Sequence, residues 1–99
     1  MNKSCFVYIL ECKDGSYYTG QTWDLKRRLS EHQQGAIIDC YTFTRRPVKL
    51  VFYEEFPSKD SALAMEHQIK KWSRKKKEAL IKRNWQLLPQ LSKKKFKKQ

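Results

Sequence analysis

A short continuous run of apolar side chains opens the chain. Residues 5–11 are mainly β-branched and aromatic, which is typical of a buried strand. The Asp14-Gly15 pair that follows predicts a hairpin turn, because glycine accepts the positive φ angle that a tight turn needs. A second strand is therefore expected beside the first. Side chains alternate across strands, so the two same-face sets are Phe6, Tyr8 and Leu10, and Ser16, Tyr18 and Gly20.

A helical pattern follows the hairpin and runs to about Gln34. Thr22 or Asp24 can cap its first turn, and Gly35 suits the left-handed conformation in which many helices end. The connection over residues 36–46 shows no regular pattern.

This helix has an apolar face with polar neighbours. Leu25 and Leu29 are four residues apart, which predicts that they anchor the helix to the sheet. Arg28 and His32 have the same spacing and lie beside that face. Both polar side chains are therefore expected to border the core.

The second half of the chain predicts a third strand and another helix. The strand covers residues 48–53, and Pro57 ends the extended segment. A helix is expected to start at Asp60 or Ser61. Its core positions at helical spacing are Ala62, Met65, Ile69 and Trp72.

The remaining elements complete a single domain. Ser73 is expected to cap a last helix over residues 74–83, which Asn84-Trp85 ends. The pattern thus predicts an α+β domain over residues 1–91, with a small three-stranded antiparallel sheet flanked by helices. A basic, lysine-rich tail is expected over residues 92–99.

Three motifs stand in order along the predicted hairpin and first helix. Val7-Tyr8-Ile9 and Tyr18-Thr19-Gly20 precede the segment from Asp24 to His32. This order resembles the GIY-YIG nuclease superfamily, most closely its small standalone members. Val7 replaces the first glycine and Thr19 the middle isoleucine, while both tyrosines and Gly20 are kept. The later segments that also resemble this group are Tyr41-Thr42, residues 45–48 and residues 66–70.

The resemblance implies a metal-dependent phosphodiester-cleaving site at Tyr8, Tyr18, Arg28, His32 and Glu66. One tyrosine can take a proton from the attacking water if nearby cations perturb its pKa, while the other positions the phosphate. Arg28 offers a charged fork to two phosphate oxygens, and His32 can relay a proton or orient the phosphate. Glu66 is implied to hold one Mg²⁺ or Mn²⁺ that acts on the leaving oxygen.

Several of these residues also have structural interpretations. Glu66 and Lys70 are one helical turn apart and can form an ordinary surface ion pair. His32 can be a core-edge histidine that bonds to the backbone. Asn84 can match an asparagine that many superfamily members carry on a late helix, or simply cap a helix end. His67 is expected to face solvent.

Positive charge collects in the last third of the chain. Residues 1–69 hold nine Lys/Arg and nine Asp/Glu, so their charges balance. Residues 70–99 hold thirteen Lys/Arg and one Glu, and this excess accounts for the whole net charge of +12. A basic block attracts polyanions through counterion release, which predicts a DNA partner and leaves RNA open. The alternatives are a solvated tail and, with less support, an anionic membrane surface. The expected contacts are Lys70, Lys71, Arg74, Lys75, Lys76, Lys77, Lys93, Lys94 and Lys95.

The cysteines and the apolar runs bear on the compartment. Cys5, Cys12 and Cys40 are odd in number and lack the paired spacing of a zinc site. Reduced thiols are therefore expected, with a catalytic cysteine near His32 as the lesser alternative. The apolar run at residues 5–10 is too short for a signal peptide, and no run has membrane-spanning length. A cytoplasmic protein without membrane attachment is expected.

The function that these features favour is a metal-dependent endonuclease that cuts DNA with little sequence preference, in structure-directed repair or processing. The rival is a nucleic-acid-binding module that keeps the fold, has little activity and uses its basic carboxyl-terminal region. A membrane-surface or ribosome-associated basic protein is a third class with less support.

Overall fold

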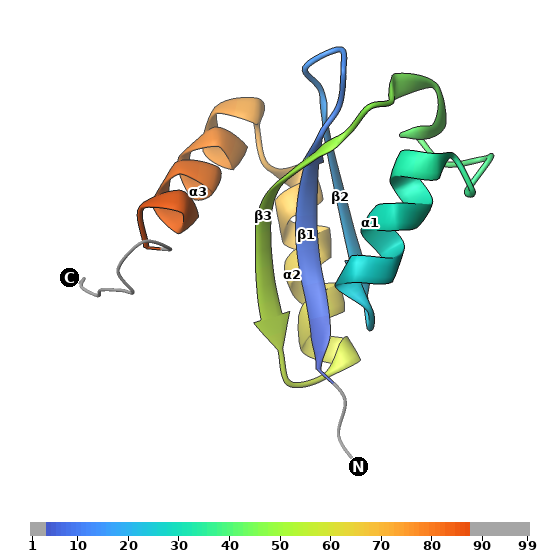
Figure 1. The fold of residues 1–99 in the computed structure, drawn as a ribbon. Coiled ribbons are helices and arrows are strands. Elements are labelled where there is room, and N and C mark those ends of the chain that lie inside the picture. The colour runs from blue at the N-terminus through green and yellow to red at the C-terminus, as the bar shows by residue number, and fades with distance from the viewer. Residues whose placement is uncertain (1–3, 88–99) are drawn as a thin grey trace.

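A three-stranded antiparallel sheet forms the centre of the protein. The computed structural model describes residues 4–87. Strands β1 (Cys5–Glu11), β2 (Tyr17–Thr22) and β3 (Lys49–Phe56) lie in the order β2-β1-β3 (Figure 1). The predicted α+β class and antiparallel sheet are confirmed. The predicted boundary at residue 91 and the basic tail lie outside the described residues.

Strands β1 and β2 form the expected hairpin. Gly15 in the turn has a φ of 86°, a conformation that favours glycine, and the backbone N–H of Cys12 donates to Ser16 O at 2.8 Å. The register places Tyr8 directly opposite Gly20. Because side chains alternate, Tyr8 and Tyr18 share one face of the sheet.

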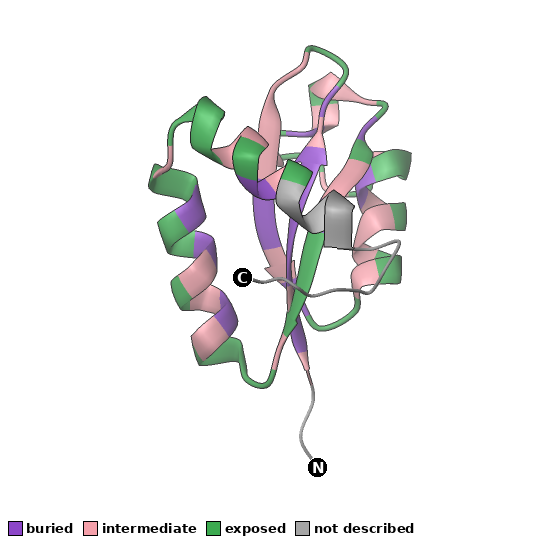
Figure 2. Ribbon diagram, turned by 90° about the vertical axis from the view of Figure 1, so that its left-hand side faces the viewer, coloured by how far each residue is buried: buried purple, intermediate pink, exposed green. Residues whose placement is uncertain are grey.

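Helices pack on both faces of this sheet (Figure 1). Helix α1 (Leu25–Gln34) covers one face, while α2 (Lys59–Lys71) and α3 (Arg74–Leu87) cover the other. The central strand β1 is consequently buried on both sides (Figure 2), which explains why its sequence is continuously apolar. None of the helices in residues 4–87 is long and apolar enough to cross a membrane.

Two separate apolar clusters hold the helices in place. The cluster beneath α1 contains buried Tyr8, Leu10, Cys12 and Val48, with Tyr18, Leu25, Leu29 and Leu50 packed against it. The cluster beneath α2 and α3 contains Cys5, Val7, Ile9, Phe52, Ala62, Ile69 and Leu80. The predicted anchoring of the first helix through Leu25 and Leu29 is thus confirmed.

The first helix begins and ends as expected. Of the two candidate caps, Asp24 is the one used, and its carboxylate accepts from the Arg27 N–H at 3.1 Å. Gly35 closes the helix with a φ of 72°. The irregular connection that follows contains one short turn of 3₁₀ helix, Phe43–Arg45.

Two predicted helix boundaries are wrong. Helix α2 starts at Lys59 instead of Asp60 or Ser61, because Ser58 caps it by accepting from the Ser61 N–H at 3.2 Å. Helix α3 starts where expected, after Ser73, but continues through residues 84–85 to Leu87. Asparagine and tryptophan are only weak helix formers and do not forbid helical backbone.

Candidate active site

A buried hydrogen bond joins β1 to α1 at the centre of the site. Tyr8 and His32 are each 1% exposed, and Tyr8 Oη lies 2.9 Å from His32 Nε2. Gly20 makes this arrangement possible, because a Cβ atom at its position would lie 2.6 Å from Tyr8 Oη. The glycine of the second motif therefore leaves room on β2 for the phenol of the first motif.

His32 is held from its other side by Thr42. Nδ1 lies 2.8 Å from Thr42 Oγ1, and this hydroxyl donates to Cys40 Sγ at 3.5 Å. Thr42 therefore accepts the Nδ1 proton, and Nε2 is left to accept from Tyr8. The partners of the imidazole are thus hydroxyl groups, and not the backbone groups of the structural interpretation.

The environment keeps His32 neutral. Burial lowers the pKa of His32, and the positive charge of Arg28 lowers it further, with only partial opposition from Glu31. A neutral imidazole at pH 7 can accept a proton at Nε2, which is the side that faces Tyr8.

Tyr18 completes an aromatic cluster with these two residues. Its ring centroid lies 6.3 Å from that of Tyr8 and 5.2 Å from that of His32. Burial raises the pKa of Tyr18 to about 12, and burial also raises the pKa of Tyr8. Arg28 lowers both values, as expected of a nearby cation, but burial outweighs it. The net shift of both phenols is therefore upward.

Arg28 lies at the rim of this cluster. Its side chain is 39% exposed, and Nε lies 3.1 Å from Glu31 Oε1. Arg27 pairs with the other oxygen of the same carboxylate at 3.2 Å, but its side chain is 76% exposed. The charge of Arg28 acts on the pKa values of both tyrosines and His32, so Arg28 is the arginine that faces the cluster.

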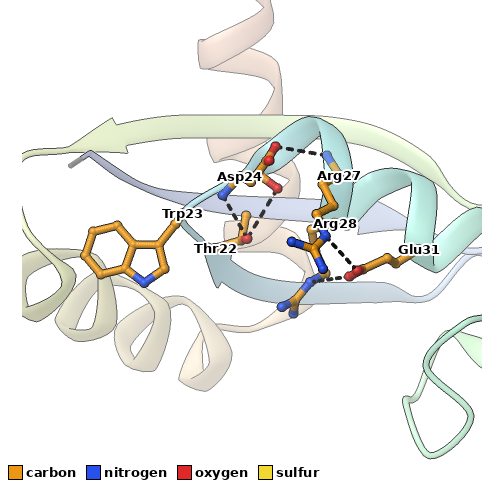
Figure 3. A pocket seen from close by; sticks show the side chains of 6 residues that line it. All are labelled: Thr22, Trp23, Asp24, Arg27, Arg28 and Glu31. Atoms are coloured by element: carbon orange, nitrogen blue, oxygen red, sulfur yellow. Dashed lines mark hydrogen bonds and ion pairs between the residues drawn. The ribbon is translucent and has the colours of Figure 1, made fainter.

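A pocket of about 230 Å³ opens beside Arg28 at the start of α1 (Figure 3). Charged side chains and one aromatic side chain line it. The lining residues are Thr22, Trp23, Asp24, Arg27, Arg28 and Glu31. The site thus has a buried part, formed by Tyr8 and His32, and an open part on the solvent side of Arg28.

Glu66 lies in the helical layer on the opposite face of the sheet from the Tyr8–His32 hydrogen bond. It lies on α2, which packs against β1 and β2, and it is only 8% exposed. Its Oε2 lies 2.7 Å from Lys70 Nζ, so the ion pair of the structural interpretation is present. However, the carboxylate of an ordinary surface pair is not this deeply buried. The Glu66 charge also contributes to the raised pKa of Tyr18, which places it within electrostatic reach of the cluster.

The side chains present suit a cation that keeps most of its own water ligands. Within residues 4–87 no group of three or more His, Cys, Asp or Glu side chains is arranged to hold a metal ion. Among the described residues, Glu66 is the one buried carboxylate, and its charge acts on the pKa of Tyr18. Mg²⁺ and Mn²⁺ are commonly bound by one or two carboxylates together with substrate phosphate oxygens, and this donor set fits them.

The predicted nucleic-acid contacts divide into two groups. Lys70 is paired with Glu66, and Arg74 Nη1 donates to the carbonyl of Gly15 at 2.7 Å, which ties α3 to the hairpin turn. The other described members are Lys71, Lys75, Lys76 and Lys77, which are exposed or half-buried along α2 and α3. Lys93, Lys94 and Lys95 lie outside the described residues, as does the side chain of Asn84.

Three further residues belong to the site: Thr42 and Trp23, which were not predicted as site residues, and Cys40, which matches the lesser alternative of a cysteine near His32. Thr42 and Cys40 belong to the irregular connection, whose course no periodicity predicts, yet Cys40 Sγ lies 3.9 Å from His32 Nδ1. Burial would raise the pKa of the Cys40 thiol, but hydrogen bonds, chiefly with Thr42, outweigh it and lower that pKa. Trp23 could have been found, because a tryptophan directly before a helix cap is a conspicuous choice for an exposed position. His67 is exposed, as predicted.

The fold and this cluster define a nuclease-type domain, and comparison with known proteins gives its family. Residues 4–79 match the GIY-YIG catalytic domain. The chain therefore belongs to the GIY-YIG family, which is part of the endonuclease superfamily. Among its relatives are UPF0213 proteins. One from Halalkalibacterium halodurans is 50% identical over 76 residues, which cover 77% of this chain and 80% of that protein. One from Streptococcus pneumoniae serotype 4 is 42% identical over 84 residues, which cover 85% of this chain and 84% of that protein.

Two solved structures share the fold. The solution structure of a UPF0213 protein from Bacillus halodurans has a TM-score of 0.53 and 48% sequence identity, and the match covers 80% of this chain and 83% of that one. The solution structure of the protein EF2693 from E. faecalis has a TM-score of 0.60 and 32% sequence identity, and the match covers 99% of this chain and 100% of that one. These matches confirm the resemblance that the motif order indicated.

Proposed function

We propose that this protein is a metal-dependent endonuclease that hydrolyses DNA phosphodiester bonds with little sequence preference. The observation that carries the proposal is the buried chain of hydrogen bonds from Tyr8 through His32 to Thr42, with Arg28 at its rim. Structural cores rarely contain such a chain of polar groups, because each member must be paired to offset its loss of hydration. Its presence beside an open pocket supports a chemical role.

The hydrogen bonds supply a route for the proton of the attacking water. A buried phenol of raised pKa is a poor base by itself. His32 Nε2 accepts from Tyr8, so Tyr8 can pass its proton to His32 as it receives one from water. Nδ1 stays bonded to Thr42, which keeps the ring oriented and disperses the positive charge that forms. In this role Tyr8 is the group that touches the water, and His32 is the proton acceptor behind it.

Arg28 and Tyr18 are suited to the phosphate. The ion pair between Arg28 and Glu31 uses Nε, so the terminal amino groups of the guanidinium can approach two phosphate oxygens. A phosphate there would also lie near the Tyr18 hydroxyl, which remains protonated at neutral pH because its pKa is about 12. A protonated phenol donates a hydrogen bond to a phosphate oxygen, so Tyr18 is the positioning tyrosine.

Glu66 is the residue that would hold Mg²⁺ or Mn²⁺. Such an ion, when bound, stabilises negative charge on the leaving oxygen as a Lewis acid. Glu66 must exchange its contact with Lys70 for the ion, which Lys70 permits because its side chain is 50% exposed and can turn into solvent. Within residues 4–87 no cluster of three or more potential metal ligands is present, so a two-metal arrangement is not part of the proposal.

The basic residues of α2 and α3 are proposed to hold the DNA backbone. Phosphate contacts of this kind carry no sequence information, which agrees with cutting of little sequence preference. We expect RNA to be a weaker alternative partner and structure-directed DNA repair or processing in the cytoplasm to be the setting.

A second candidate function rests on the same structure. The upward pKa shifts of both tyrosines and the Lys70 partner of Glu66 would suit a nucleic-acid-binding module with little activity. Binding without cleavage separates this rival from the nuclease.

The experiment that tests the proposal incubates the purified protein with labelled single-stranded, duplex and branched DNA. Mg²⁺ or Mn²⁺ is supplied in one series and a chelator in the other. We expect cleavage of at least one substrate with metal and none with chelator, and an Arg28→Ala variant should lose most of it. Binding of all three substrates without cleavage of any would instead establish the binding module.

A further inference from the structure

Trp23 occupies a position that local helix packing does not explain. It stands directly before the cap Asp24, and a large apolar residue there usually packs on the residue four positions into the helix. In this chain that residue is Arg28, which is charged and faces the site. The indole is 42% exposed and belongs to neither apolar cluster. Part of its large ring is therefore presented to solvent.

The indole forms one wall of the pocket at the start of α1. Figure 3 shows Trp23 on one side and the two arginines with Glu31 on the other. The pocket of about 230 Å³ is smaller than the roughly 300–1,000 Å³ that drug-sized ligands occupy, so it suits one flat group and not a large molecule. A flat ring could lie against the indole with its edge toward the charged wall.

Arg27 is the cation of the pocket that is most available to an anion. Two arginines and two carboxylates line the pocket, so their formal charges balance. Glu31 is shared by the two arginines, through one oxygen each, and Asp24 accepts from the Arg27 N–H as the helix cap. Arg27 is the more exposed arginine, and its guanidinium can turn toward an anion while Arg28 stays at the cluster. A ligand with a flat aromatic part and a phosphate matches these groups.

We propose that this pocket binds one unpaired nucleotide of the DNA strand, next to the phosphate that is cut. The base stacks on Trp23, and the phosphate of the same nucleotide contacts Arg27. The inference rests on the proposed function, because Arg28 lines the pocket and is also the residue assigned to the scissile phosphate. A base within a duplex is covered on both faces by its neighbours and is not available for stacking. The substrate class is therefore DNA with an unpaired base at the cut, such as a single strand, a flap or a branch.

The test measures binding in chelator, where no cutting occurs. Fluorescence anisotropy is recorded with labelled single-stranded DNA, with a flap and with a blunt duplex of the same sequence. Trp23→Leu, which keeps an apolar side chain but removes the aromatic face, should weaken single-strand and flap binding by about 5- to 150-fold, as for the loss of one base–aromatic stack. Trp23→Phe should retain most of the affinity, and duplex binding should change little in both variants.

Tyr53 provides a matched control. It is 41% exposed, close to the exposure of Trp23, but it lies on β3 and does not line the pocket. Tyr53→Leu should leave all three affinities unchanged. Circular dichroism confirms that each variant is folded.

Three results would overturn the inference. They are an equal loss on all three probes, no loss in Trp23→Leu, and failure of the unaltered protein to bind the single strand. Cleavage is assayed separately with metal. A protein that cuts nothing would refute the nuclease, while the binding comparison would still decide whether Trp23 stacks an unpaired base.

Discussion

At the scale of single residues, close packing and complete hydrogen bonding of the site reinforce one another. The Tyr8 phenol lies over Gly20, and its hydroxyl meets a ring nitrogen of His32. Neither contact could survive a shift of the ring by an ångström, so the backbone at Gly20 and the imidazole jointly determine its place. Two substitutions separate the contributions of space and of hydrogen bonding.

Gly20→Ala removes the space. A Cβ atom there would lie 2.6 Å from Tyr8 Oη and 2.7 Å from the ring carbon that bears it, so the phenol must move. We expect a loss of about 1–3 kcal/mol in the free energy of unfolding, typical of overpacking, together with loss of cleavage. Urea denaturation measures the stability. Gly15→Ala is the control, because no atom lies within 4 Å of its added Cβ and only the positive φ is strained. A Gly20→Ala variant as active as the parent would contradict the packing role.

Tyr8→Phe keeps the ring and removes the hydroxyl. His32 Nε2 then stays buried without its partner, which should cost about 1–3 kcal/mol of stability. The cleavage rate should fall by roughly 10²–10⁴-fold, as for the loss of a proton-transfer group. Single-turnover kinetics and denaturation of the same samples give both numbers. Full activity with reduced stability would leave Tyr8 a purely structural residue.

At the scale of elements, regular segments were predictable from the sequence and the irregular one was not. The run at residues 5–11, the Asp24 cap and Gly35 each carry a local signal, and the structure confirms the hairpin and α1. The start of α2 was misplaced because Ser58, Asp60 and Ser61 are all plausible caps in sequence. The Thr42 contact with His32 depends on the path of the connection, which no local pattern encodes. Spacing could therefore predict which residues border the core, but not what they bond to.

The ion pair between Glu66 and Lys70 on α2 leads to a prediction about metal binding that does not depend on cleavage. Lys70→Met should raise the affinity for Mn²⁺ about twofold or more, because the competing ion pair is worth at least the ~0.3–0.5 kcal/mol of a helical pair of this spacing. Electron paramagnetic resonance of free Mn²⁺ measures the affinity without any cleavage. Lys71→Met is the control, since it removes the same charge from an exposed position one residue on. Equal affinities in both variants would show that Glu66 does not hold the ion.

At the scale of the whole molecule, the excess positive charge and the candidate catalytic residues lie in different parts of the chain. Residues 1–69, which supply every candidate catalytic side chain, carry equal numbers of acidic and basic residues, and the excess lies in residues 70–99. DNA affinity and turnover should therefore respond to different parts of the chain. The described basic residues on α2 and α3 would remain after removal of the tail.

Truncation after Leu91 tests this separation by removing five lysines at positions 93, 94, 95, 97 and 98. The slope of log affinity against log salt should flatten by roughly 0.7–0.9 for each DNA phosphate that the shortened protein no longer neutralises, while turnover at saturating DNA and low salt is retained. Filter binding over a salt series measures the slope. An unchanged slope would show that the tail contacts no phosphate and would assign the basic contribution of the last third of the chain to residues 70–82.

The central claim, metal-dependent cleavage at the Tyr8–His32 cluster, is tested most directly by the single-turnover rate of Glu66→Gln with Mg²⁺. Glutamine keeps the size of the side chain and removes the charge, and the Glu66–Lys70 pair involves a half-exposed lysine, so the fold should persist. We predict that the unaltered protein cuts branched or single-stranded DNA, and that Glu66→Gln binds the same DNA equally well but cuts it no faster than a chelated control. A Glu66→Gln variant that cuts at the rate of the unaltered protein would contradict the account.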